Sequence, residues 1–196
     1  MRVFSVRVAM CWGGICAAQD HIPWKTLANW QISVDTTIQN GCYAVTGWDS
    51  GTALRIGLNP AKDSFYLLVG NKTWTQFAPN TPYDIRIKFD SKAAWDITAT
   101  RLKVYANDAT YLHAEGSSYA FLEEFMVQRE MKITHNNAPL DRLPLRGSAR
   151  ALQEVIACQK EVDAKGVPTP EPLARAEGRS DVVSAGEGEA MALNHD

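Results

Sequence analysis

Cysteines are the residues of this chain whose spacing most directly implies covalent chemistry. The 196 residues include four of them. Cys11 and Cys16 lie in an N-terminal segment with features of a secretory signal, so its removal would leave only Cys42 and Cys158. A pair in an oxidising compartment is expected to form a disulfide, and the alternative is two buried free thiols. Neither cysteine has a CxxC or histidine neighbour, so we expect no metal site.

Asp49-Ser50-Gly51-Thr52 is the one segment that matches a catalytic motif. It resembles the Asp-Ser/Thr-Gly motif of retroviral-type aspartic proteases, in which two such aspartates share a proton. Those motifs follow an apolar strand closely, whereas Gly47-Trp48 precede the aspartate here. A hairpin turn explains the same four residues, so we expect no catalytic residue. The alternative is a hydrolase in which Asp49 meets another carboxylate in the fold, from Asp84, Asp90 or Asp96.

Three tryptophans, Trp48, Trp74 and Trp95, lie close to the ends of expected strands. Aromatic side chains there can form a platform for a ligand, and tryptophan is enriched at binding hot spots. The alternative is that they fill the core or close its ends. The chain has no Gly-x-Ser-x-Gly elbow and no phosphate-binding glycine loop, and we expect no cofactor.

The first 18 residues have the composition of a secretory signal. Arg2 and Arg7 flank the start, Val8–Ala18 is apolar apart from small residues, and small residues precede a break into polar sequence. These features favour a signal segment over residues 1–18 and a periplasmic or secreted protein. The alternative is a disordered or buried N-terminal segment of a cytosolic protein. A lipoprotein centred on Cys16 is less favoured, because Ile15 stands where a small residue is expected.

Alternation of apolar and polar residues dominates the middle of the chain. Period two is typical of half-buried strands, whose successive side chains point to opposite faces of a sheet. Turn signals recur about every eight to twelve residues, which is typical of an antiparallel sandwich or small barrel. The strands expected from this pattern are Trp30–Asp35, Cys42–Val45, Ala53–Leu58, Ser64–Gly70, Thr73–Phe77, Tyr83–Asp90, Trp95–Ala99 and Arg101–Tyr105, the last two separate or joined by a bend, followed by a short alternation at Met131 and Ile133.

Two helices are expected after Gly116. The first carries Phe121, Leu122, Phe125 and Met126 on one face, with Ser117 or Ser118 as its N-cap. The second begins with Ser148 as its N-cap, and its apolar stripe includes Cys158, which could reach Cys42 on a strand below. The fold class is therefore mainly β, an antiparallel β-sandwich or small barrel with a short helix and a C-terminal helix packed on it. The domain spans residues 30–163, and residues 165–196 form a disordered acidic tail.

Charge and hydropathy exclude several kinds of partner. The chain has 20 basic and 22 acidic residues, a net charge of −2, which becomes −4 when residues 1–18 and their two arginines are removed. No basic stripe is interleaved with aromatics, so nucleic acid is not an expected partner. No apolar run approaches the ~20 residues that span a bilayer, so no integral membrane span is expected.

Several short segments together resemble a family of exported proteins. They are the Trp30 strand, Gly41-Cys42, the Asp49–Thr52 turn, Asn71 with Trp74, and Leu143-Pro144-Leu145-Arg146-Gly147-Ser148 followed by Cys158. The chain resembles, over about residues 30–162, uncharacterised small exported proteins of proteobacteria and, more loosely, the invasion-associated locus B type. The resemblance implies a periplasmic or secreted location and a β-rich fold, and it transfers no catalytic residue. The tail after Lys165 and the glycines within the signal segment depart from the family pattern.

These observations favour a non-enzymatic exported module that binds a protein or a component of the cell envelope. The strand-rich domain contains no evident catalytic constellation. Two alternatives remain: a hydrolase whose acidic residues assemble only in the fold, and a structural component of an envelope assembly.

Overall fold

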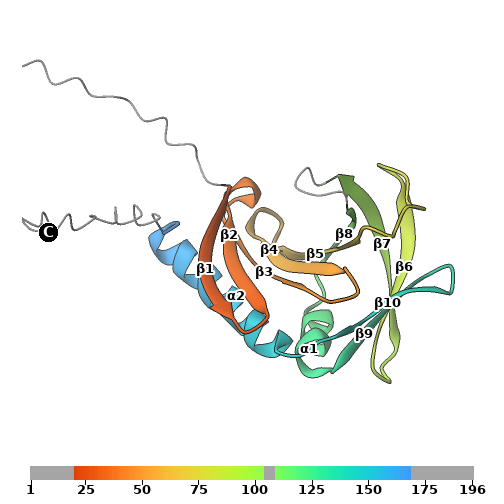
Figure 1. Ribbon diagram of the computed structural model, residues 1–196. Helices are drawn as coiled ribbons and strands as arrows, with labels where there is room; N and C mark the ends of the chain where they lie inside the picture. Colours follow the sequence, from red (N-terminus) through yellow and green to blue (C-terminus); the bar gives the residue numbers. More distant parts are fainter. Residues whose placement is uncertain (1–19, 104–108, 169–196) are drawn as a thin grey trace, which may run out of the picture.

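The computed structural model describes residues 20–103 and 109–168. This part of the chain is mainly antiparallel β, with one sheet of ten strands and two α-helices (Figure 1). The sandwich-like fold confirms the predicted fold class, including a C-terminal helix. The predicted signal segment and the predicted tail beyond residue 168 lie outside the described residues.

The strands follow the chain in a simple order. They are β1 (His21–Leu27), β2 (Trp30–Asp35), β3 (Gly41–Gly47), β4 (Ala53–Asn59), β5 (Ser64–Asn71), β6 (Pro82–Phe89), β7 (Ala94–Lys103), β8 (Thr110–Gly116), β9 (Glu130–His135) and β10 (Ala138–Pro144). The helices are α1 (Tyr119–Val127) and α2 (Ser148–Lys165), and short 3-10 turns join β2 to β3 and β4 to β5.

The sheet has two halves that enclose one core. Its strand order is β1-β2-β3-β4-β5-β8-β7-β6-β9-β10, and buried side chains of both halves belong to a single cluster. Two tryptophans tie the N-terminal half to the chain around and after β10. The Trp48 indole N–H donates to the Pro144 carbonyl at 3.1 Å, and that of Trp30 donates to the Arg146 carbonyl at 3.0 Å.

The predicted alternation sets which face of each strand is buried. Leu54 and Ile56 of β4 are almost fully buried, as are Ile32 and Val34 of β2. The side chain between the first two, Arg55, points to the opposite face. Because truncating a buried Leu or Ile to Ala costs about 2–5 kcal/mol, this inner face stabilises the fold strongly.

α2 packs against β2, β3 and, more lightly, β4. Its buried residues include Ala151, Val155, Cys158 and Val162, and the predicted place of Cys158 on the buried face is confirmed. The N-cap prediction was wrong: Gly147 caps α2 with a φ of 84°, a left-handed conformation that favours glycine. Ser148 instead begins the helix, and its hydroxyl donates to the Phe125 carbonyl of α1 at 2.8 Å.

α1 follows Ser118, which occupies the N-cap position without a side-chain capping bond. Phe121 and Phe125 point into the core, where Phe121 stacks on Phe65 with ring centroids 5.4 Å apart. Neither helix in the described ranges combines the length and apolar character needed to cross a membrane.

The two edge strands, β1 and β10, were not predicted. Each contains proline, which cannot donate to a sheet ladder and is therefore tolerated at an edge. The register of both edge pairs also shifts beside a proline, after Pro23 in β1 and after Pro139 in β10. These prolines and register shifts interrupt the alternation of apolar and polar residues, so the sequence pattern does not predict a strand there. β8 was also not predicted.

The prediction of a strand over Thr73–Phe77 was wrong. The segment after β5 forms turns, with backbone hydrogen bonds from Trp74 to Asn71 and from Thr75 to Thr73. Trp74 and Phe77, three residues apart, are both buried, a spacing that a flat strand does not allow. The two segments expected around Thr100 form the single strand β7 in the described residues.

Candidate functional site

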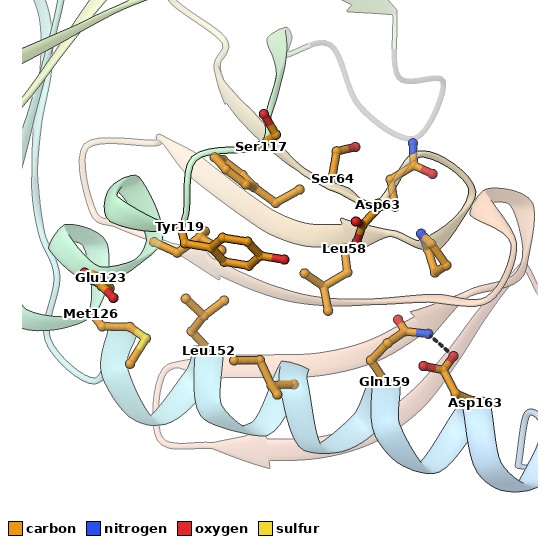
Figure 2. A pocket seen from close by; sticks show the side chains of 15 residues that line it. Leu58, Asp63, Ser64, Ser117, Tyr119, Glu123, Met126, Leu152, Gln159 and Asp163 are labelled. Atoms are coloured by element: carbon orange, nitrogen blue, oxygen red, sulfur yellow. Dashed lines mark hydrogen bonds between the residues drawn. The ribbon is translucent and has the colours of Figure 1, made fainter.

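A groove opens between α1, α2 and the hairpin that joins β4 to β5 (Figure 2). Its volume is about 520 Å³, within the range of small-molecule sites. Leu58 points from the hairpin toward α2, and Tyr119 extends from α1 over the space between them. We refer to this feature, lined by the three elements, as the helix–hairpin groove.

Side chains from both helices face the groove, most of them apolar. On α2, Leu152, Ile156, Gln159 and Asp163 recur at helical spacing and form a second stripe beside the one that packs on the sheet. On α1, Tyr119, Leu122 and Met126 also recur at helical spacing and face the groove. Tyr119 is 72% exposed and Ile156 is 39% exposed, so the groove presents apolar surface to solvent that a ligand could cover.

Two residues that line the groove each carry a buried polar side-chain atom without a hydrogen-bond partner in the described structure. The atoms are Asn59 Oδ1 and Ser64 Oγ. The two residues face each other as the last backbone pair of the β4–β5 ladder. Between them the chain turns through Pro60–Lys62 and Asp63, whose φ is 47°. An unsatisfied buried polar group costs about 1–3 kcal/mol, so each calls for an explanation.

The charged side chains that line the groove are all acidic. They are Asp63, Glu123 and Asp163. Asp163 Oδ1 accepts a hydrogen bond from Gln159 Nε2 at 2.9 Å. The wall is therefore apolar with a carboxylate rim.

The Cys42–Cys158 disulfide is present, which confirms the prediction and replaces the alternative of two free thiols. It joins β3 to α2 with the Cα atoms 6.1 Å apart, within the usual range. The backbone N–H of Cys42 also donates to Gln159 Oε1 at 2.8 Å, in a buried position. Gln159 is a groove residue, so the same two contacts that hold α2 to the sheet also position one wall of the groove.

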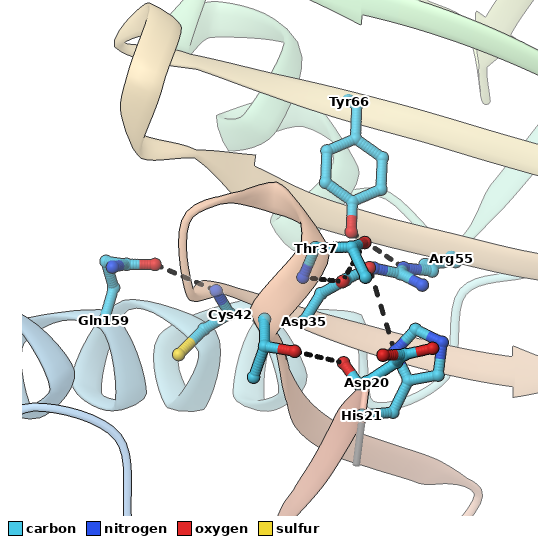
Figure 3. A network of polar contacts seen from close by, with 9 residues as sticks. Asp20, His21, Asp35, Thr37, Cys42, Arg55, Tyr66 and Gln159 are labelled. Carbon is cyan, nitrogen blue, oxygen red and sulfur yellow. Dashed lines mark hydrogen bonds and ion pairs between the residues drawn. The ribbon is translucent and has the colours of Figure 1, made fainter. Parts of the chain in front are cut away.

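A second polar cluster lies on the opposite face of the sheet, around Arg55 (Figure 3). Arg55 forms an ion pair with Asp35 of β2, and its Nε donates to the Tyr66 hydroxyl at 2.7 Å. Its guanidinium also lies over the Tyr43 ring, 3.5 Å from the centroid. Gln159 and Cys42 appear in the same view, apart from this cluster.

The electrostatics of this cluster hold its charges in place. Burial raises the pKa of Asp35, but hydrogen bonds from Thr37 and Arg55 and the charge of Arg55 outweigh it, so the pKa lies below its ordinary value. Burial raises the pKa of the Tyr66 hydroxyl, against the opposing effect of Arg55. The carboxylate is thus kept ionised and the phenol neutral. Because every member has a partner within the cluster, we interpret it as structural.

Asp49 lies exposed in the turn between β3 and β4. Backbone hydrogen bonds from Trp48 to Thr52 and from Gly51 to Trp48 close this turn. The Ser50 and Thr52 hydroxyls donate to Asp141 of β10, so the motif residues dock the turn on that strand. Among the described residues, no hydrogen bond or ion pair joins Asp49 to Asp84, Asp90 or Asp96. The last two bond elsewhere, Asp90 to the Arg129 backbone and Asp96 to Arg86.

The three tryptophans of the expected ligand platform occupy separate places. Trp74 is buried and packs edge-on against Phe77. Trp95 is half-buried, with its ring against Phe121 and its indole N–H bonded to Glu124 at 2.9 Å. Trp48 is half-buried and bonds to Pro144. No ring contact joins one of them to another within the part of the chain described.

Sequence reasoning placed Leu122 and Met126 on the apolar face of the first helix but did not predict a groove. One signal was present: adjacent apolar pairs on α2, Ala151-Leu152 and Val155-Ile156, make a stripe too wide for a single contact with the sheet. Asn59 and Ser64 gave no signal, since Asn59-Pro60 is an ordinary end to a strand.

No group of three or more His, Cys, Asp or Glu side chains within residues 20–103 and 109–168 is arranged to hold a metal ion. No family model, curated protein or solved structure matches the chain.

Proposed function

We propose that this protein is an exported, non-enzymatic binding module whose ligand occupies the helix–hairpin groove. The observation that carries the proposal is the pairing of exposed apolar groove residues with two buried, unpartnered polar atoms, Asn59 Oδ1 and Ser64 Oγ. A ligand would cover the exposed apolar side chains and, once hairpin side chains shift, would offer hydrogen-bond partners to the two polar atoms. Sites of this kind combine apolar walls with a few polar groups that fix orientation.

Export to the periplasm or the exterior is the second part of the proposal. It is supported by the basic start and short apolar run of residues 1–18 and by the Cys42–Cys158 disulfide, because disulfides persist in oxidising compartments. The resemblance to small exported proteins of proteobacteria supports the same location. The ligand is then expected to be a protein or a component of the cell envelope.

Binding at the groove is tested with N-phenyl-1-naphthylamine, a neutral apolar dye that fluoresces when it leaves water. We expect the purified protein to bind it, and Ile156→Gln to weaken binding roughly fivefold through lost apolar contact. Leu102→Gln is the matched control, since Leu102 is 40% exposed against 39% for Ile156 and does not line the groove. Equal affinities for the two variants would contradict the proposal.

Export is tested by the intact mass of the protein from its native host, with and without reduction and alkylation. We expect a mass that lacks residues 1–18 and two cysteines that react only after reduction. A full-length mass with reactive thiols would contradict export and leave the binding proposal standing.

A further inference from the structure

We propose that the helix–hairpin groove selects a small amphiphilic cation that carries N–H donors, a primary ammonium or guanidinium group on an apolar body. This inference rests on the proposed function and names the chemical class of its ligand. It follows from three properties of the groove: the sign of its charges, the hydrogen-bonding type of its unpartnered atoms, and its size.

Charge gives the first argument. Asp63, Glu123 and Asp163 line the groove, and no Lys, Arg or His does. Lys62, the neighbour of Asp63, is turned to Glu115 of β8, whose two carboxylate oxygens lie 2.7 and 2.8 Å from its Nζ. The carboxylates of the rim are therefore not neutralised by that lysine. Since opposite charges attract most strongly near low-dielectric walls, a cation is favoured there and an anion is repelled.

Hydrogen bonding gives the second argument. Asn59 Oδ1 can only accept, and Ser64 Oγ can accept as well as donate. Asn59 is more than nine-tenths buried, and its Oδ1 has no partner in the described structure. A ligand with N–H groups can satisfy both oxygens and the carboxylates, whereas a quaternary ammonium can satisfy none of them and a carboxylate could only accept from the Ser64 hydroxyl. Because both oxygens have almost no exposed area, side chains of the hairpin must move as the donor enters.

Size gives the third argument and separates a small molecule from a protein partner. The groove holds about 520 Å³, and its apolar walls come from Leu58, Tyr119, Met126, Leu152 and Ile156. A stable protein interface buries at least about 1,000 Å², with a continuous apolar centre. Only two large apolar side chains of the groove are strongly exposed, Tyr119 and Ile156. An apolar chain with one charged end fits this geometry better than a folded partner.

A matched set of eight-carbon compounds tests the inference by calorimetric titration: octylammonium, octyltrimethylammonium, 1-octanol and octanoate. We expect octylammonium to bind most tightly, octyltrimethylammonium and octanol more weakly, and octanoate at least about tenfold more weakly than octylammonium. Added salt should weaken octylammonium binding and leave octanol binding unchanged.

Three variants connect the selectivity to named residues. Glu123→Gln should lower the affinity for both cations and leave that for octanol unchanged, and the exposed Asp49→Asn should change none of them. Asn59→Leu, which replaces the unpaired amide with an apolar side chain of similar size, should remove the preference for octylammonium over octyltrimethylammonium. It should also leave the protein folded, because removing an unpaired buried polar group is neutral or stabilising.

The outcomes separate this inference from the proposed function. Equal binding of octanoate and octylammonium, both weakened by Ile156→Gln, would overturn the cation inference and retain the groove as the binding site. Failure of all four compounds and of the neutral dye would overturn both. A much tighter complex with the peptide acetyl-Leu-Leu-Arg-amide than with octylammonium would overturn the assignment to a small amphiphile and assign the cation to a protein side chain.

Discussion

The backbone N–H of Cys42 lies 2.8 Å from Oε1 of Gln159, the residue that follows the disulfide partner of Cys42. β3 and α2 are thus joined at one point by a covalent bond and by a buried hydrogen bond. Gln159 also lines the groove, and its amide nitrogen donates to Asp163 at the rim. The segment of α2 around Cys158 and Gln159 therefore both anchors the helix to β3 and forms one wall of the proposed site.

Removing the disulfide should lower stability substantially. The bond joins residues 116 positions apart, and in the chain-entropy model a loop of this length contributes roughly 4–5 kcal/mol. We expect the double variant Cys42→Ala/Cys158→Ala to unfold at lower urea concentration by about that free energy, and reduced wild-type protein to match it. A difference below about 1 kcal/mol would show that tertiary packing alone holds α2 in place.

Replacing Gln159 should also destabilise the protein, by about 1–3 kcal/mol, because the buried N–H of Cys42 would lose its acceptor. Gln159→Met keeps the length of the side chain and removes the acceptor oxygen. Gln153→Met on the exposed side of the same helix is the control, and we expect it to change the free energy of unfolding by less than about 0.5 kcal/mol. Similar losses for both variants would contradict a specific role for the hydrogen bond.

The Asp35–Arg55 pair should make stability depend on acid pH. The pKa of Asp35 is lowered from 3.8 in the folded protein, so its contribution is fully present above 3.8 and is lost as pH falls through the folded value. Asp35→Asn leaves Arg55 unpaired in a largely buried position, and we expect a loss of roughly 3–5 kcal/mol at pH 7.

The check is urea unfolding of both proteins at pH 7 and at a series of values below pH 4. The difference between wild type and Asp35→Asn should shrink as the carboxyl becomes protonated. Asp49→Asn, at an exposed turn, is the control. A difference that stays constant with pH would show that the loss comes from packing and not from the charge.

His113 should add a separate pH dependence nearer neutrality. Burial lowers its pKa below 6.5, Glu115 opposes this, and Lys62 and Arg55 add to it. The neutral ring is therefore favoured in the folded state, and its contribution is present above pH 6.5 and lost as pH falls through the folded pKa. We expect His113→Gln to flatten the fall in unfolding free energy between about pH 7 and pH 5. Parallel curves for the variant and the wild type would contradict this.

Gly57 should be intolerant of any side chain. A Cβ there would lie 2.5 Å from the Tyr66 hydroxyl and 2.7 Å from the Tyr43 Cβ, so Gly57→Ala must displace the rings that flank Arg55. We expect a loss of about 1–3 kcal/mol in thermal or urea unfolding. At Gly47, the nearest atom to an added Cβ is 3.7 Å away, and Gly47→Ala should be neutral. Equal stability of the Gly57→Ala and Gly47→Ala variants would contradict the predicted clash of a Cβ at Gly57 with Tyr43 and Tyr66.

The sequence alone predicted the features that repeat along the chain. Alternation located β2, β4, β5 and β6, and helical spacing placed Cys158 on the buried stripe of α2 above β3. These predictions succeed because a side chain's direction on a strand or helix follows from local geometry, and burial of one face imposes a period that can be seen in the residues.

The edges, the caps and the groove were decided by tertiary structure. β1 and β10 form only because a neighbouring strand supplies their partners, and Gly147 rather than Ser148 caps α2 because the chain enters the helix in a left-handed conformation. Asn59 and Ser64 are ordinary residues until the hairpin, α1 and α2 meet around them. A site built from three elements depends on which surfaces are left uncovered when they pack, and no local period in the sequence encodes that.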